Sequence, residues 1–347
     1  RPHMPICLYG LYAHIGGASS DTSPVKTISG EYLAELLNWV ESIGTLHNPP
    51  VSSTPVVDLQ RQDPQVPSRS DLPQLNNYAQ LELNGEHRLA GYVEASHGCT
   101  HLCKHCPVPA LYKGKIRVVD EDVVLNDIAN LVTMGAQHIS FGDPDFLNAP
   151  RHSIRIIRRM HETFSDITFD CTTKVEHILR NAAIWEEMSA AGCIFVVSAF
   201  ECLNDDILVR LDKGHTAKDS SRSVKVLRQH GIEPRPSFLP FTPWSTVQDV
   251  FDILDFVATN TLVSNVDPIQ YSIRLLIPPG SLILDDPDCP TYLKEFDHET
   301  LSYVWKPTNP LLDVLQKQLV AVAENAAQTE EAPLVTFLKI REAVLGS

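Results

Sequence analysis

The chain has 347 residues, of which 43% are hydrophobic and 20% charged, and its formal net charge is −15. This length exceeds one average domain and allows a sizeable core. The negative charge would repel a phosphate backbone, and no stretch approaches the roughly 20 apolar residues of a membrane-spanning helix, so we expect neither nucleic acid nor a membrane as a partner. The eight cysteines include a tight triplet and no secretory signal is recognised, which favours a cytoplasmic protein.

The first 89 residues divide into two segments. Residues 1–45 are predicted to form a partial Rossmann-like segment, because an apolar strand at 6–9 runs into Gly10 and a helical pattern covers about 31–43. Residues 46–89 are rich in Pro, Ser, Asp and Gln and lack periodicity, which is typical of a linker.

Residues 90–289 alternate between apolar strand patterns and helical patterns, and six βα units are predicted. The expected strands lie near 91–96, 138–142, 167–173, 194–199, 234–240 and 268–276. Such units form a parallel sheet, either doubly wound or a partial barrel, with chemistry at the carboxyl ends of the strands. The first helix is expected to begin after Asp120 and to stop at Gly135. Residues 290–347 are predicted to be a helical extension.

Three cysteines follow the first of these strands with the spacing C-x3-C-x2-C: Cys99, Cys103 and Cys106. Thiolates on one short loop can converge on one inorganic centre. A cubane cluster normally takes four cysteines, so three would leave one iron open to another ligand. The alternative is a structural zinc site, since Cys3His is an ordinary zinc set. Its fourth ligand would be one of three nearby histidines: His97, His101 or His105.

This motif at the start of a six-fold βα series resembles the signature of the radical S-adenosylmethionine (SAM) superfamily. The resemblance implies an α/β fold with a partial (β/α)6 barrel, and a [4Fe-4S] cluster on Cys99, Cys103 and Cys106. It implies that SAM chelates the open iron and that one electron cleaves a carbon–sulfur bond of SAM. A small-molecule substrate and an electron donor such as flavodoxin or ferredoxin are the implied partners.

Polar residues after the second and third strands are candidate SAM contacts. Where the superfamily carries a turn that contacts the SAM amino group, this chain has Gly142, which permits a close backbone approach, and Asp143 and Asp145, which can accept hydrogen bonds from an ammonium. A turn with solvated carboxylates is the alternative. Lys174 either neutralises a carboxylate or forms a surface ion pair with Glu176.

Later strands supply further candidates. Ser198 and Glu201 resemble the superfamily's ribose-binding positions, whereas Thr216 is better explained as a helix cap. Polar residues that alternate along the fifth and sixth strands are candidate SAM or substrate contacts. They are Arg235, Ser237, Gln270, Tyr271 and Arg274.

A closer resemblance is carried by six short motifs: Tyr9-Gly-Leu-Tyr12, Gly30-Glu-Tyr32, Gly91-Tyr-Val-Glu-Ala-Ser96, Gly142-Asp-Pro-Asp-Phe-Leu-Asn148, Lys174-Val-Glu-His177 and Lys213-Gly-His-Thr216. They are similar to radical SAM proteins that have a cobalamin-domain-like N-terminus and a cysteine-rich tail. That group includes an enzyme of arsinothricin biosynthesis, which transfers the 3-amino-3-carboxypropyl group of SAM to trivalent arsenic. This chain departs from the group, because it has no Asp-x-His-x-x-Gly sequence and no cysteine after Cys289. We therefore do not expect cobalamin.

The leading hypothesis is a radical SAM enzyme, a transferase of natural-product biosynthesis with trivalent arsenic as the candidate acceptor. Its first rival is a conventional 5′-deoxyadenosyl-radical enzyme or a cobalamin-dependent methylating enzyme acting on a small molecule. The non-enzymatic rival is a zinc-stabilised binding module.

Overall fold

The computed structural model describes residues 5–16, 25–45, 55–83 and 85–346. The chain divides into two compact units, and each unit is assembled from stretches that are distant in the sequence. Unit 1 consists of Arg1–Pro64, Gly98–Arg117 and Leu276–Trp305, and unit 2 consists of Gln65–His97, Val118–Leu275 and Lys306–Ser347. The chain leaves unit 2 within β6 (Ser96–Gly98) and returns to it within β7 (Ile116–Val118).

Unit 1 contains a three-stranded parallel sheet with the strand order β1-β2-β3. Its elements are β1 (Ile6–Tyr9), α1 (Ala13–Gly16), β2 (Val25–Gly30), α2 (Leu33–Thr45) and β3 (Val56–Asp58). Gly30 ends the central strand with φ +87°, and a Cβ there would lie 2.1 Å from the Asp58 carbonyl oxygen. The turn therefore requires glycine. The predicted strand at 6–9 is confirmed, and the helix predicted at 31–43 corresponds to α2.

The remaining stretches of unit 1 contribute short elements: α3 (Pro107–Tyr112), η7 (Leu282–Asp285), α11 (Cys289–Tyr292), β12 (Leu293–Asp297) and β13 (Ser302–Trp305). Side chains tie these stretches together. The Tyr112 hydroxyl donates to the Glu31 carboxylate at 2.9 Å, and the Ser281 hydroxyl donates to the Lys104 carbonyl at 3.3 Å. Strands β12 and β13 pair antiparallel, within sequence that was expected to begin a helical extension.

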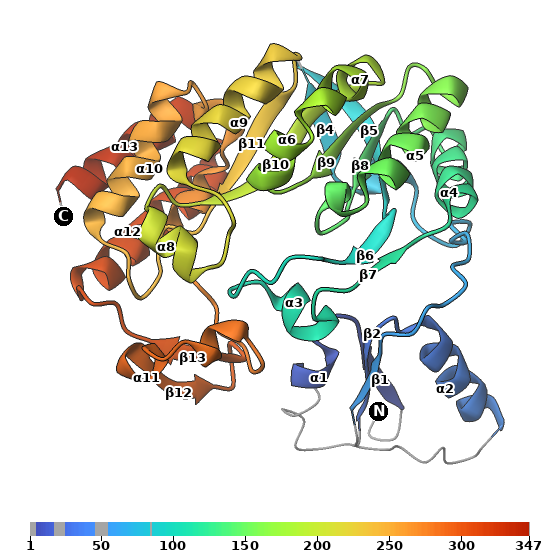
Figure 1. Ribbon diagram of the computed structural model, residues 1–347, viewed down its shortest axis with the longest axis horizontal. Coiled ribbons are helices and arrows are strands. Elements are labelled where there is room, and N and C mark those ends of the chain that lie inside the picture. Colours follow the sequence, from blue (N-terminus) through green and yellow to red (C-terminus); the bar gives the residue numbers. More distant parts are fainter. Residues whose placement is uncertain (1–4, 17–24, 46–54, 84, 347) are drawn as a thin grey trace. The chain divides into compact units, whose positions relative to one another are not determined.

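Unit 2 is built on a curled, six-stranded sheet that forms a half-barrel (Figure 1). Its strands, in spatial order, are β11 (Glu233–Phe238), β10 (Cys193–Glu201), β9 (Thr168–Thr172), β8 (His138–Phe141), β5 (Glu86–Val93) and β4 (Gln80–Leu83). The strands from β5 to β11 run parallel, and β4 pairs antiparallel with β5 at the edge. The predicted partial-barrel architecture is thus confirmed, and all carboxyl ends of the parallel strands lie at one edge of the sheet.

Helices cover the outer face of this sheet (Figure 1). The helices of unit 2 are α4 (Glu121–Thr133), α5 (Pro150–Thr163), α6 (Val175–Arg180), α7 (Trp185–Ala190), α8 (Asp205–Arg210), α9 (Ala217–Gln229) and α10 (Val247–Thr259), followed by α12 (Leu311–Thr329) and α13 (Pro333–Leu345), which pack against each other. Successive side chains of a strand point to opposite faces. Ile139, Phe169 and Val196 therefore share the outer face and are fully buried in the core. None of the described helices is long and apolar enough to cross a membrane.

Helix ends follow the capping chemistry of the sequence. The Asp120 carboxylate accepts from the Asp122 amide at 2.9 Å and starts α4, and Gly135 follows its end with φ +99°. Thr216 and Asp219 form a reciprocal capping box at the start of α9. The predicted caps at Asp120 and Thr216 and the stop at Gly135 are confirmed.

The expected sixth strand at 268–276 does not form. Pro268 instead opens a short 3-10 helix, η6 (Pro268–Ser272), and the Asp267 carboxylate caps it by accepting from the Ile269 amide at 3.2 Å. Arg274 pairs with Phe241 as an isolated bridge, parallel to the sheet direction. The proline and its aspartate cap therefore favour a helical turn here, although polar and apolar residues alternate as in a strand.

Candidate functional site

The cysteine loop follows Gly98 in unit 1. Gly98 has φ +76°, and a Cβ there would lie 2.3 Å from the Lys115 carbonyl oxygen, so the close passage of two backbone segments requires glycine. Cys99 and Cys103 are buried and Cys106 is half-buried. The Cys106 amide donates to the Cys103 carbonyl at 3.1 Å, which turns the loop back on itself.

The loop offers three free thiols to an inorganic centre. All eight cysteines lie in the described residues, and none of them is in a disulfide. Three sulfur donors are one fewer than the four that a [4Fe-4S] cluster usually takes, which leaves one iron for another ligand. Cys99, Cys103 and Cys106 are therefore the residues that would hold such a cluster.

Two carboxylates follow β8 in unit 2, and they have different surroundings. Asp143 is 2% exposed and accepts from the Ala95 amide at 2.9 Å and the Ser96 hydroxyl at 2.6 Å. Burial outweighs these hydrogen bonds and raises the pKa of Asp143 to about 6. The preceding residue, Gly142, has to be glycine, because a Cβ there would lie 2.0 Å from the Tyr92 ring.

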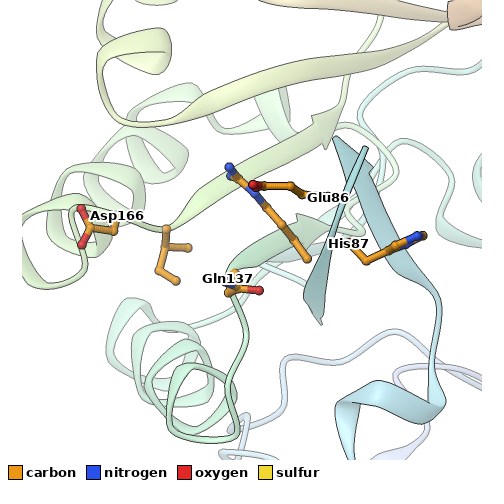
Figure 2. A pocket seen from close by; sticks show the side chains of 6 residues that line it. Glu86, His87, Gln137 and Asp166 are labelled. Carbon is orange, nitrogen blue, oxygen red and sulfur yellow. The ribbon is translucent and has the colours of Figure 1, made fainter. Parts of the chain in front are cut away.

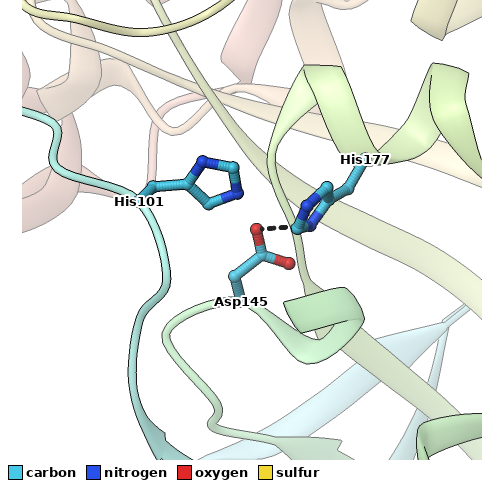
Figure 3. Close-up of side chains that lie close together, drawn as sticks. All are labelled: His101, Asp145 and His177. Atoms are coloured by element: carbon cyan, nitrogen blue, oxygen red, sulfur yellow. Dashed lines mark ion pairs between the residues drawn. The ribbon is translucent and has the colours of Figure 1, made fainter. Parts of the chain in front are cut away.

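Asp145 is fully buried and holds together the ends of β8 and β9. It accepts from the Thr173 hydroxyl at 2.6 Å and the Leu147 amide at 3.0 Å, and the Nδ1 atom of His177 lies 2.9 Å from it (Figure 3). Burial raises the pKa of this carboxyl, but the His177 ring and the Thr173 hydroxyl more than offset it, and the net pKa is lowered. Asp145 is thus an ionised positioning residue.

Lys174 occupies the position before the short helix α6, just after the end of β9. Its ammonium lies 3.6 Å from a Glu176 carboxylate oxygen, so the ion pair considered from the sequence is present. The pair is not a surface pair, because Lys174 is only 8% exposed. A buried lysine beside the carboxyl ends of strands is a stronger candidate for anion binding than an exposed one.

Glu201 ends β10 and pairs with a lysine that sequence reasoning did not assign. The Lys213 ammonium lies 2.9 Å from Glu201 Oε1, and both residues are buried. Glu201 has φ +62°, an unusual conformation for a residue with a side chain, and such strain is common at functional sites. Ser198 shares the outer face with Val196 and is fully buried, and its hydroxyl has no hydrogen-bond partner among the described residues.

His215 completes this group of charged residues. Burial, together with the nearby Lys213 ammonium, lowers its pKa to about 4, so the imidazole is neutral at pH 7. Gly214 lies between the pairs, since a Cβ there would lie 2.7 Å from a Glu176 oxygen and 3.7 Å from the Lys174 ammonium. We call Lys174, Glu176, Glu201, Lys213 and His215 the strand-end cluster.

The remaining predicted residues make other contacts. The Arg235 guanidinium lies over the Phe195 ring at 3.8 Å from its centroid. Gln270 accepts a hydrogen bond from the Phe238 amide at 3.1 Å, which commits its side-chain oxygen to the backbone. Tyr271 is buried edge-on to Phe337, and burial raises its pKa.

A shallow cavity of about 540 Å³ lies at the opposite edge of the sheet (Figure 2). Glu86, Arg88, Gln137 and Asp166 line it, together with His87 and Ile167. These residues lie at the amino ends of β5, β8 and β9. The cavity therefore shares no residue with the strand-end cluster.

Comparison with known proteins identifies the domain. Residues 93–257, which include the cysteine loop and β8 to β11, match the model of the Radical SAM superfamily. The chain is 22% identical over 228 residues to bacteriochlorophyllide d C-12(1)-methyltransferase of Chlorobaculum tepidum, a match that covers 62% of this chain and 46% of that protein. The chain thus spans less than half the length of this curated relative.

Two solved structures have a similar fold. One is the cobalamin-dependent SAM radical enzyme OxsB with aqua-cobalamin and SAM bound, with a TM-score of 0.70 and 14% identity, covering 96% of this chain and 59% of that one. The other is the radical SAM methyltransferase TsrM from Kitasatospora setae with tryptophan and a SAM analogue bound. It has a TM-score of 0.61 and 16% identity, and the match covers 74% of this chain and 54% of that one.

Residues 93–257 are therefore similar to a radical SAM domain, which is an enzyme domain. The domain implies a [4Fe-4S] cluster and SAM as cofactors, as predicted from the sequence. The expectation that cobalamin is not bound finds no support, because the similar OxsB structure contains it. Arsenic as acceptor and transfer of the aminocarboxypropyl group find no support in these comparisons either.

Sequence reasoning gave no role to His177, Lys213 or His215, although the structure buries all three beside predicted site residues. The sequence offered one indication of these residues, which is their position along the chain. His177 follows β9 within the string Lys174-Val-Glu-His177, whereas Lys213 and His215 lie between α8 and α9 within the string Lys213-Gly-His-Thr216. A string of polar residues at a strand end indicates a site, but it does not say which residue pairs with which.

The pairing of Lys213 with Glu201 generates a stability prediction. Lys213→Met removes the cation from a buried ion pair, and we expect the free energy of unfolding to fall by about 3–5 kcal/mol in a chemical denaturation experiment. Lys218→Met, at an exposed position on α9, is the matched control and should change stability by less than about 0.5 kcal/mol. Equal losses in the two variants would contradict the pairing.

Proposed function

We propose that this enzyme cleaves SAM at a [4Fe-4S] cluster held by Cys99, Cys103 and Cys106, and transfers a SAM-derived group to a small molecule. The observation that carries the proposal is the three-thiol loop inside the segment that matches the superfamily model. When bound, the cluster and SAM supply one-electron cleavage of a carbon–sulfur bond. A small electron-transfer protein such as flavodoxin or ferredoxin is the proposed reductant.

The strand ends offer complementary groups for the two polar ends of SAM. We propose that Gly142 and Asp143 receive the amino group, because Asp143 is a buried carboxylate directly after β8 that can accept a hydrogen bond from an ammonium. Lys174 would neutralise a carboxylate, and Glu201 would accept hydrogen bonds from ribose hydroxyls.

The other predicted contacts have supporting positions. Asp145 orients the ends of β8 and β9 through Thr173 and His177. Ser198, Gln270 and Tyr271 are buried or bonded elsewhere, and we propose that they shape the neighbouring backbone instead of contacting SAM. Arg235 is considered separately below.

A methyl group is the transferred group that the comparisons favour, since the Chlorobaculum tepidum relative and TsrM are both methyltransferases. The sequence contains no Asp-x-His-x-x-Gly motif, so no residue is assigned to cobalamin and no step is derived through it. The second candidate is transfer of the aminocarboxypropyl group to trivalent arsenic, and the motifs shared with the arsinothricin group support it.

The cluster assignment can be tested by metal analysis. Anaerobically reconstituted protein should contain about four irons and four sulfides per chain, because three thiolates on one loop are the ligands of one cubane. Cys103→Ala should lose most of the iron. Cys7→Ser, which changes a half-buried cysteine outside the loop, should keep it. Stoichiometric zinc without sulfide would restore the binding-module alternative.

The proposed role of Asp143 has a characteristic pH dependence. Its pKa of about 6 means that the carboxyl is neutral below that pH and charged above it, so it attracts an ammonium only as pH rises. Calorimetry on reconstituted protein should show SAM affinity rising about tenfold between about pH 5 and 7. Asp143→Asn should bind SAM more weakly at pH 7 and remove most of this rise. The same rise in both proteins would assign it to another group.

The transferred group is identified by what remains of SAM. Methyl transfer leaves S-adenosylhomocysteine, whereas aminocarboxypropyl transfer leaves 5′-methylthioadenosine. We expect S-adenosylhomocysteine from reduced holoenzyme, and none from Cys103→Ala, when the nucleosides are separated by liquid chromatography and identified by mass. Methylthioadenosine that depends on added arsenite would favour the second candidate. Deoxyadenosine alone would contradict group transfer.

A further inference from the structure

The inner face of the half-barrel carries a charged side chain that the proposed SAM contacts do not use. In β11, Pro234 and Pro236 are buried on the outer face, whereas Arg235 alternates with them and is half-buried. Its guanidinium lies over the ring of Phe195 from the neighbouring strand β10, 3.8 Å from the ring centroid. The aromatic face fixes the plane of the guanidinium.

Arg235 has no hydrogen-bond acceptor or ion-pair partner among the described residues. The charge that acts on it is Asp170, whose carboxylate already accepts from the Ser140 hydroxyl at 2.6 Å and faces the His138 ring at 2.8 Å. Burial lowers the pKa of Arg235 more than Asp170 raises it. A guanidinium has five donors and stays charged in proteins, so this position suits a bound anion.

We propose that Arg235 binds a carboxylate of the substrate on the inner face of the half-barrel. This inference rests on the proposed function, because it assumes that the inner face receives the substrate. A planar carboxylate matches the fork of a guanidinium whose face is stacked on Phe195. The nearby Asp170 and the single cation favour a singly charged anion over phosphate.

The position of Phe195 separates this site from the strand-end cluster. Phe195 and Glu201 lie on the same strand, six residues apart in the numbering, which corresponds to roughly 20 Å at the usual rise per residue. SAM bound at Glu201 through its ribose therefore does not need Arg235. The carboxylate at Arg235 belongs to a second molecule that reaches into the half-barrel.

The test compares benzoate with its neutral analogue benzamide, by ligand-observed NMR titration of anaerobically reconstituted holoenzyme. We expect wild-type protein to bind benzoate and to discriminate against benzamide. Arg235→Gln should weaken benzoate binding on the order of tenfold or more, and Arg235→Lys should weaken it less, because the charge remains but the planar fork is lost. Arg158→Gln is the matched control, since Arg158 is an exposed arginine of α5 paired with Glu187.

Two parallel measurements separate this inference from the proposed function. SAM affinity should be unchanged in Arg235→Gln, and its thermal stability should fall only slightly, because the stacking on Phe195 is the contact that is lost. Absent benzoate binding, equal affinity in wild type and Arg235→Gln, or equal binding of benzamide, would overturn the carboxylate site. A tenfold loss of SAM affinity in Arg235→Gln would assign the residue to SAM. Failure of wild-type holoenzyme to bind SAM would instead overturn the proposed function.

Discussion

A carboxylate without exposed surface must be surrounded by donors, and Asp145 obtains two of its donors from the segment after the neighbouring strand. The Thr173 hydroxyl and the His177 ring come from the β9 end, whereas Asp145 itself follows β8. Leaving these atoms unpaired would cost several kcal/mol, so the two strand ends are held in one arrangement. The backbone at Gly142 and the start of α6 at Lys174 take their places from this contact.

The two faces and the carboxyl edge of the half-barrel carry different kinds of side chain. Its outer face is apolar and covered by helices, its inner face carries polar residues such as Asp170 and Arg235, and its carboxyl ends carry the strand-end cluster. This sorting follows from alternation along each strand combined with parallel order across the sheet. The cluster contains both signs of charge beside a neutral imidazole at His215, which suits a zwitterionic ligand better than a simple anion.

The sequence predicts the parallel strands and their helices well, because apolar runs and caps such as Asp120 and Thr216 act locally. The same locality explains the failure at 268–276, where Pro268 and its Asp267 cap outweigh a weak alternation. The cysteine loop is recognisable because its ligands are close in sequence. The partners of His177 and Arg235 cannot be recognised in the same way, because each partner lies on or after a different strand, and the pairing depends on the register between strands.

Unit 1 includes β1 and the cysteine loop, and its last stretch in the sequence is Leu276–Trp305. The ribosome synthesises these stretches in sequence order, so the cysteine loop is made long before Leu276–Trp305. During that interval Cys99, Cys103 and Cys106 lack their final surroundings and are open to oxidation. The cysteine loop therefore reaches its final surroundings in unit 1 only after Trp305 has been synthesised.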